Sequence, residues 1–269
     1  MSAEPRFDRA AFEARLGTRR LGRFLMVRDE ASSTNDLAWD LLAEGGPDGA
    51  AVIAETQLAG RGRAGRRWVM APGRGLALSV ALHLGCDRRQ AGLVSMAAGL
   101  ALAEALEGLG RVADLKWPND LLLRGRKVSG ILAESRRLPL TGDAVVVGIG
   151  VNVLERRDDF PPELHDQATS LSLEGLETTR EAVAAAFLDA FEPRWDELQE
   201  GDRDRLLSAW SARSGGWGRA VVVRTPAGER RGVALRLDDD GALVIRDAGG
   251  GEVTVMAGDL AWDEAGARS

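Results

Sequence analysis

A segment dense in glycine and arginine, residues 60–67, limits what this chain can fold into more than any other stretch. It reads Gly-Arg-Gly-Arg-Ala-Gly-Arg-Arg and follows the apolar run Ala50–Ala54, which is typical of a buried strand. Glycine lets the backbone turn tightly and approach a ligand, and arginine presents a planar fork of donors to carboxylate or phosphate oxygens. Because the like charges repel each other, we expect this arginine loop to bind an anion.

Two other interpretations of the loop are open at this point. Gly60, Gly62 and Gly65 have the spacing of a dinucleotide-binding fingerprint, but that motif needs a helix directly behind the glycines. Pro72 and Gly73 disfavour a helix there. The plainer alternative is a solvated basic surface loop without a ligand.

Composition sets broad limits on the class of protein. The 269 residues are 45% hydrophobic and 28% charged, as expected for one large globular domain, alone or with a small one. The net charge of −6 does not favour nonspecific binding to nucleic acid, and the single cysteine, Cys86, excludes an internal disulfide framework. Without an apolar signal core or a stretch of membrane-spanning length, the sequence predicts a cytoplasmic protein that does not associate with membranes.

The distribution of basic residues is uneven. Of 35 basic residues only Lys116 and Lys127 are lysines, and they lie eleven positions apart. Arginine therefore supplies the general surface charge, and we interpret Lys116 in particular as a position that needs a compact ammonium. The presence of lysine rather than arginine at position 127 is explained equally well by chance and by function.

Periodicity and punctuation predict a large α+β domain at residues 1–214 and a small β domain at 215–269. Strands are expected at 23–27, 50–54, 76–84, 112–116, 121–124, 127–134 and from 145, and helices at 7–16, 35–44, 88–109, 178–194 and 202–212. A capping box, Thr178 with Glu181, is expected to open the fourth helix. Alternating strands at 220–224, 231–237, 242–245 and 253–256 predict a small β-barrel that packs on the first domain.

Four motifs occur in order along the chain. They are Ser33-Thr34-Asn35, the loop from Gln57 to Arg66, Lys116-Trp117-Pro118-Asn119-Asp120, and Gly148-Ile149-Gly150-Val151-Asn152. Together they resemble the biotin–protein ligases, also called biotin–acetyl-CoA-carboxylase ligases, over about residues 20 to 260. The resemblance implies a class II synthetase-like mixed sheet with helices mainly on one face, followed by an SH3-like β-barrel. About twenty residues precede the first strand, too few for the DNA-binding helix-turn-helix domain of some members, so no repressor function or DNA partner is expected.

The resemblance also implies a reaction and its participants. Biotin would be activated by ATP as biotinyl-5′-AMP and transferred to a lysine of a biotin carboxyl carrier protein, with Mg²⁺ as cofactor and a homodimer as a possible assembly. Lys116 and Arg63 would be catalytic. The residues that would bind biotin or its adenylate are Ser33, Thr34, Asn35, Gln57, Gly60, Arg61, Gly62, Arg63, Arg66, Trp68, Lys116, Asn119 and Gly130. Asn152 would lie on the nucleotide side, and Asp120 would either hold Mg²⁺ or cap a turn.

Two competing functions are consistent with parts of this pattern. A lipoate ligase or octanoyl transferase would have a similar fold, and the arginine loop favours the biotin branch over it. A biotin-sensing binding protein without turnover would not need Lys116 together with the complete arginine loop, so the sequence favours an enzyme.

Overall fold

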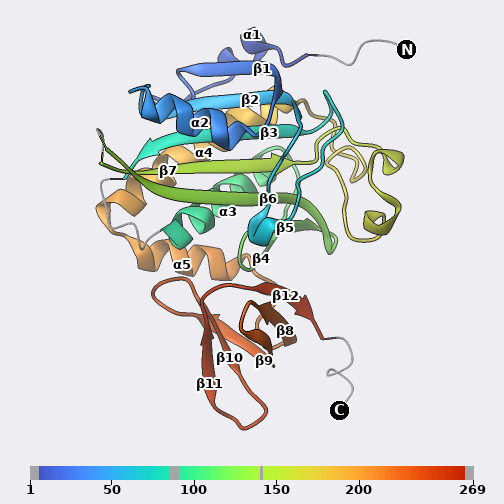
Figure 1. Cartoon of the computed structure of the whole chain (residues 1–269). Coiled ribbons are helices and arrows are strands. Elements are labelled where there is room, and N and C mark those ends of the chain that lie inside the picture. The colour runs from blue at the N-terminus through green and yellow to red at the C-terminus, as the bar shows by residue number, and fades with distance from the viewer. Residues whose placement is uncertain (1–5, 85–90, 140–141, 264–269) are drawn as a thin grey trace.

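The computed structural model of the chain describes residues 6–84, 91–139 and 142–263, which form two β-sheets and their helices (Figure 1). The larger sheet has the strand order β1-β2-β3-β7-β6-β5-β4. Its strands are β1 Leu25–Ala31, β2 Ala50–Gln57, β3 Leu76–His83, β4 Asp114–Lys116, β5 Asp120–Leu123, β6 Arg126–Leu138 and β7 Gly142–Val151. Only β1 and β2 pair in parallel, and all the other neighbours are antiparallel. The predicted mixed sheet is confirmed.

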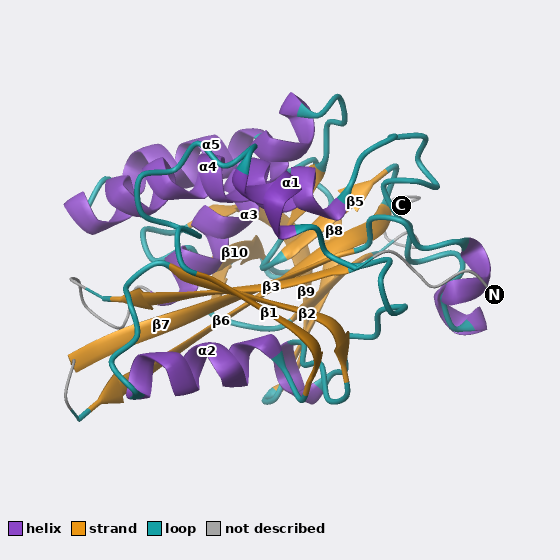
Figure 2. Cartoon of the chain, turned by 90° about the horizontal axis from the view of Figure 1, so that it is seen from above, coloured by secondary structure: helices purple, strands orange, loops and turns teal. Residues whose placement is uncertain are grey.

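Helices cover the two faces of this sheet unequally (Figure 2). Four of them, α1 Arg9–Glu13, α3 Ala91–Gly108, α4 Arg180–Glu200 and α5 Arg203–Ala212, lie on one face, and α2 Thr34–Ala43 lies on the other. The helix α3 is apolar around its circumference because it packs between the sheet and α4. A separate small core forms where Trp39 and Leu42 of α2 meet Ala81 and Val146 of the sheet.

The C-terminal sheet is antiparallel, with the strand order β11-β10-β9-β8-β12. Its strands are β8 Ala220–Thr225, β9 Gly228–Leu237, β10 Leu243–Arg246, β11 Glu252–Val255 and β12 Asp259–Trp262. The predicted small β domain is confirmed, with β12 as an additional strand. Within the described ranges the pairing of strands leaves the sheet open between β11 and β12, so it is not closed into a barrel.

Trp117 connects the two sheets. Its side chain is buried, and its Nε1 donates a hydrogen bond to the carbonyl of Gly241 over 3.0 Å. The peptide bond to Pro118 is cis. The turn between β4 and β5 therefore lies directly against the C-terminal sheet, which brings the predicted Lys-Trp-Pro-Asn-Asp motif to the junction of the two sheets.

The ends of α4 differ from the sequence interpretation. Thr179, rather than Thr178, caps the helix, with its side chain accepting a hydrogen bond from the backbone of Ala182. The helix continues past Pro193 to Glu200, because burial of Trp195 and Leu198 outweighs the backbone hydrogen bond that a proline removes. Cys86 lies outside the described residues. No helix that the structure describes has the length and apolar character needed to cross a membrane.

Candidate functional site

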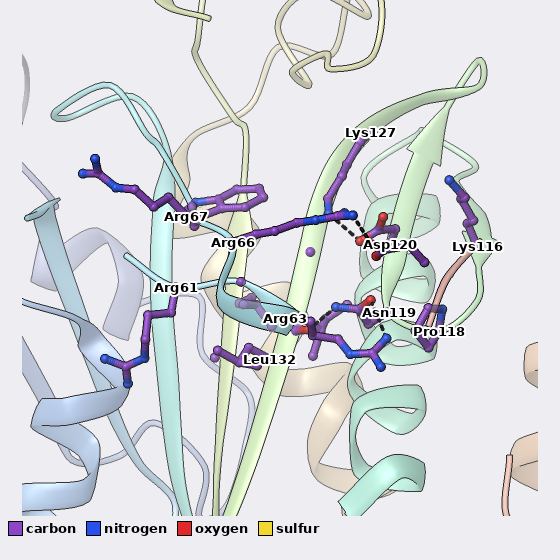
Figure 3. A pocket seen from close by; sticks show the side chains of 18 of the residues that line it. Arg61, Arg63, Arg66, Arg67, Lys116, Pro118, Asn119, Asp120, Lys127 and Leu132 are labelled. Atoms are coloured by element: carbon purple, nitrogen blue, oxygen red, sulfur yellow. Dashed lines mark hydrogen bonds and ion pairs between the residues drawn. The ribbon is translucent and has the colours of Figure 1, made fainter. Parts of the chain in front are cut away.

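A cavity of about 310 Å³ opens on the α2 side of the larger sheet, where it meets the C-terminal sheet (Figure 3). It brings together most residues that the sequence singled out: Ser33, Thr34, Asn35, Gln57, Arg61, Gly62, Arg63, Arg66, Trp68, Lys116, Asn119, Asp120 and Gly130. Gly60 does not line it. Asn152 lines an adjoining cavity of about 420 Å³ instead, and its Nδ2 donates a hydrogen bond to the carbonyl of Thr169 over 2.9 Å.

Buried polar groups at the start of α2 form one wall of the first cavity. The backbone N–H of Thr34 donates to Gln57 Oε1 over 2.8 Å. Asn35 Nδ2 donates to Glu134 Oε2 over 2.8 Å, and the Ser79 hydroxyl lies 2.6 Å from Asn35 Oδ1. Ser33 is the N-cap residue of α2, but its side chain makes no capping hydrogen bond. These contacts hold amide and hydroxyl groups in fixed positions at the cavity wall.

Two glycines of β7 make room for this wall. Along the face of β7 that points toward α2, Ala144 and Val146 belong to the small core, and Gly148 and Gly150 follow at the same spacing. A Cβ atom on Gly148 would overlap Asn35 Oδ1, and one on Gly150 would overlap the indole of Trp68. Both glycines line the cavity, and they belong to the fourth motif but not to the predicted binding residues.

Two arginines of the loop already have acidic partners. Arg61 forms two hydrogen bonds with Asp36, at 2.7 and 2.8 Å, and this contact raises the pKa of Arg61 and lowers that of Asp36. Arg66 forms an ion pair with Asp259 of β12. Carboxylates from α2 and from the C-terminal sheet therefore balance the charge of these two arginines, and the predicted binding of an anion by the loop stays a prediction.

Arg63 is held differently. Its guanidinium makes one long hydrogen bond of 3.4 Å to Asn119 Oδ1. Burial lowers the pKa of Arg63, because the charged form loses hydration and the nearby Asp259 and Asp120 oppose this effect only in part. Figure 3 shows its side chain running along the cavity toward Asn119. Of the three arginines in the Gly60–Arg66 segment, Arg63 is therefore the one best placed to gain from an anionic ligand.

Both lysines of the chain line both cavities. Lys127 Nζ donates to Asp120 Oδ1 over 2.5 Å and lies 5.9 Å from the centre of the Trp68 ring (Figure 3). Burial lowers the pKa of Lys116, and the nearby Asp120 only partly opposes this effect. Lys127 was left out of the predicted site, although the scarcity of lysine pointed to it as well.

The Asp120 carboxylate is occupied by Lys127 rather than free to hold a metal ion. Among residues 6–84, 91–139 and 142–263, no group of three histidine, cysteine or acidic side chains is arranged to hold a cation. The donor set therefore does not fit a Mg²⁺ site made by the protein alone.

The C-terminal sheet completes the first cavity. Arg224 of β8 and Asp259, Leu260 and Ala261 of β12 line it. No sequence signal marked these residues, because β12 is only four residues long and was not predicted. Its pairing with β8 places Asp259 beside Arg224 at the cavity.

The adjoining cavity contains an unusual buried acid, Glu155. The residue is 2% exposed, and neither carboxylate oxygen makes a hydrogen bond of ordinary geometry to any part of the protein that the structure describes. Burial raises the pKa of Glu155 to about 7, and the backbone N–H groups of Glu155 and Val153 oppose this only in part. Such a group destabilises the fold when it is charged.

We expect Glu155→Gln to stabilise the ligand-free protein at high pH. In the unfolded chain Glu155 loses its proton near the ordinary value of 4.5, but the folded protein keeps that proton up to about pH 7. Stability contributed by this residue therefore falls as the pH rises between these values. The free energy of unfolding of the variant minus that of wild type should therefore be about 3 kcal/mol larger at about pH 8 than at about pH 4. Chemical denaturation at both pH values measures this, and an equal change at both would contradict it.

Comparison with known proteins places these features in one family. Residues 28–152 match the model of the biotin/lipoate A/B protein ligase family, and residues 217–260 match that of the biotin protein ligase C-terminal domain. A biotin–[acetyl-CoA-carboxylase] ligase of Paracoccus denitrificans is 39% identical over 241 residues, which cover 87% of this chain and 98% of the relative. Its namesake in Mycobacterium tuberculosis is 37% identical over 248 residues, 88% of each chain. The biotin protein ligase from Aquifex aeolicus in complex with biotin and ATP superposes with a TM-score of 0.74, at 28% identity over 90% of this chain and 99% of that one.

Proposed function

We propose, because the chain belongs to the biotin/lipoate A/B protein ligase family, that it is an ATP-dependent biotin–[acetyl-CoA-carboxylase] ligase. In the first step the biotin carboxylate attacks the α-phosphate of ATP, which gives biotinyl-5′-AMP and pyrophosphate. In the second step the amine of an acceptor lysine attacks the activated carbonyl, and AMP leaves. The relatives are named as ligases for acetyl-CoA carboxylase, and we expect the acceptor lysine to lie on a biotin carboxyl carrier protein.

The observation that carries this proposal is the position of the cations between the two cavities. Both cavities are lined by the same four cations, so each opens onto the same group of positive charges: Arg66, Arg67, Lys116 and Lys127. A reaction between a carboxylate and a triphosphate must overcome the repulsion of two anions. Positive charges fixed where the two meet lower that repulsion and stabilise the charge that builds up in the transition state.

We assign biotin to the first cavity and the nucleotide to the second. The wall formed by Thr34, Asn35 and Gln57 offers donors and acceptors to a polar ligand head, and Trp68 lines both spaces. Asn152 lines only the second cavity, which supports its proposed place on the nucleotide side. Lys116 and Arg63 are the proposed catalytic residues, and Lys127 joins them because it reaches the same junction.

Several finer points of the proposal follow from the family. Any Mg²⁺ enters with the phosphates of ATP, since Asp120 is already bound to Lys127. Residues 1–214 form the catalytic domain and 215–269 the C-terminal domain, which supplies Asp259 to the first cavity. A cytoplasmic location and a homodimer also remain predictions.

Biotin-dependent release of pyrophosphate from ATP tests the function. We expect release with biotin, and little with lipoate or octanoate in its place. The family model includes lipoate enzymes, so faster release with lipoate would assign the chain to that branch instead. Tight biotin binding without any release would indicate a binding protein without turnover.

We expect Arg63→Ala to let biotinyl-5′-AMP escape about tenfold faster, because the change removes a partly desolvated charge from the ligand's anionic groups. The rate of adenylate dissociation is measured by rapid dilution of the complex and separation of the free ligand. Arg246→Ala is a suitable control, since Arg246 of β10 is exposed and lines neither cavity. Equal escape from the Arg63→Ala and wild-type proteins would remove Arg63 from the site.

A further inference from the structure

Lys127 lies at an irregular position of β6. Along the pairing of β5 with β6, Leu121 is opposite Ser129, but the next residue, Leu122, is opposite Lys127, so Val128 is left without a partner on β5. Such an extra residue is a β-bulge, which bends the strand and changes the direction of the side chains beside it. Bulges are frequent next to active sites for this reason.

The bulge directs the side chain of Lys127 into the first cavity. In a regular strand Lys127 and Gly130, which are three positions apart, would lie on opposite faces of the sheet. In this structure they share a face, since both line the cavity and a Cβ atom added to Gly130 would lie 3.1 Å from Lys127 Nζ. Val128 takes the place in the main core, where it is fully buried.

A distant segment holds the backbone at the bulge. The regular pairing of β6 with β7 ends at Ser129, and residues 167–169, which we call the lysine clamp, pair with the backbone of Lys127 instead. The N–H of Lys127 donates to the carbonyl of Gln167 over 2.7 Å, and its carbonyl accepts from the N–H of Thr169 over 2.9 Å. The direction of the Lys127 side chain therefore depends on where the lysine clamp lies.

Buried polar contacts fix the lysine clamp in turn. Thr169 is fully buried, its hydroxyl donates to Glu174 Oε1 over 2.7 Å, and its carbonyl accepts from Asn152 Nδ2 over 2.9 Å. The Glu174 side chain, which is only 2% exposed, also accepts a hydrogen bond of 2.7 Å from Arg126. Because Arg126 directly precedes Lys127 in β6, Glu174 joins the lysine clamp to this strand a second time.

We propose that Thr169 and Glu174 are positioning residues, which hold the lysine clamp on the bulge and thereby direct the Lys127 ammonium to the junction of the two cavities. This inference rests on the proposed function for the part that Lys127 plays in forming the adenylate. The ammonium lies 2.5 Å from Asp120 Oδ1 and 5.9 Å from the centre of the Trp68 ring, so a small rotation of the strand separates it from both. Misplacement of a reacting group by about 1 Å can cost a factor of about 100 in rate.

The scarcity of lysine makes the position of this side chain directly measurable. A protein labelled with carbon-13 in its lysine side chains gives two Cε signals by NMR, from Lys116 and Lys127, and the two Lys→Arg variants assign them. We expect Thr169→Val, which removes the hydroxyl and keeps the shape, to shift the Lys127 signal and leave the Lys116 signal near its wild-type position. Thr169→Ser keeps the hydroxyl and should give the wild-type signals.

The same variants are tested for single-turnover formation of biotinyl-5′-AMP. We expect Thr169→Val to slow this step at least about tenfold while biotin affinity changes less. In a Lys127→Met background the same change should slow it no further, because the side chain that Thr169 positions is absent. Thr18→Val is the matched control and should react as wild type, since it removes another buried hydroxyl that donates to a backbone carbonyl, far from both cavities.

The outcomes separate the lysine clamp from the ligase function. An unchanged Lys127 signal in a folded Thr169→Val protein overturns the inference, and so does an equal further loss of rate in the Lys127→Met background. If Thr169→Val does not fold, Asn152→Asp is measured instead, because it places an acceptor against the carbonyl of Thr169, and an unchanged Lys127 signal there also overturns the inference. A shifted Lys127 signal in a chain whose wild type releases no pyrophosphate with biotin supports the lysine clamp and contradicts the ligase function.

Discussion

Replacing Lys116 or Lys127 by arginine is expected to slow the formation of biotinyl-5′-AMP at least about tenfold each, and about 100-fold in the double variant, although the charge is conserved. Arginine supplies 33 of the 35 positive charges of this chain, so the two lysines are exceptions. Both line the two cavities at their junction. The expected loss corresponds to about 1.4 kcal/mol of transition-state stabilisation for each single variant.

The reason is the size and shape of the cation. Lys127 Nζ lies 2.5 Å from Asp120 Oδ1, and a Cβ atom added to Gly130 would lie 3.1 Å from the same Nζ. A guanidinium is wider than an ammonium and prefers a planar partner, so it cannot take the same position. Lys116 has no hydrogen-bond or ion-pair partner among the residues that the structure describes, and burial lowers its pKa. Charge that develops on the reacting oxygens would therefore stabilise its ammonium in the transition state.

Single-turnover formation of the adenylate at saturating ATP and biotin measures this effect, with calorimetric biotin binding alongside. Binding should change less than the rate, because most of the charge interaction arises during the reaction. Arg246→Lys, an exposed residue of β10, controls for the exchange of one basic side chain for another. A normal single-turnover rate in both lysine variants would mean that these residues supply only general positive charge.

Local patterns in the sequence were sufficient for most of the fold. Apolar runs predicted the strands around β2, β3 and β7 and the helix α3, because their burial is nearly continuous along the chain. The failures lie where distant packing decides the outcome. The continuation of α4 past Pro193 depends on the burial of Trp195, and β12 depends on pairing with β8, some 35 residues earlier.

The candidate site shows the same division. The predicted site residues come mostly from the four motifs, and all of them except Gly60 and Asn152 line the first cavity. The partners of the arginine loop were not predictable, since Asp36 and Asp259 lie 25 and 193 residues from the arginines they bind. Glu155 carried no signal either, because its burial results from the packing of Met70 and Gly75 around it.

The glycines of β7 were a readable signal that the sequence interpretation used only in part. Two glycines that are two residues apart in a strand lie on the same face of the sheet. That face therefore lacks two successive side chains. In this protein that face is filled by Asn35 and Trp68, which reach over from α2 and from the segment after the arginine loop. The hydrogen bonds of Asn35 to Glu134 and Ser79 therefore depend on the lack of a side chain at Gly148.

Gly148→Ala is expected to weaken biotin binding at least about 100-fold, because the added methyl group displaces Asn35 and leaves buried polar groups without partners. The strand cannot move away, since β7 is hydrogen-bonded to β3 on one side and β6 on the other. Gly108→Ala is the matched control, as a Cβ atom there meets nothing within 4 Å. Calorimetric titration of biotin into both variants measures the effect, and circular dichroism checks that they are folded. Normal biotin affinity in a folded Gly148→Ala protein would show that the wall around Asn35 does not bind biotin.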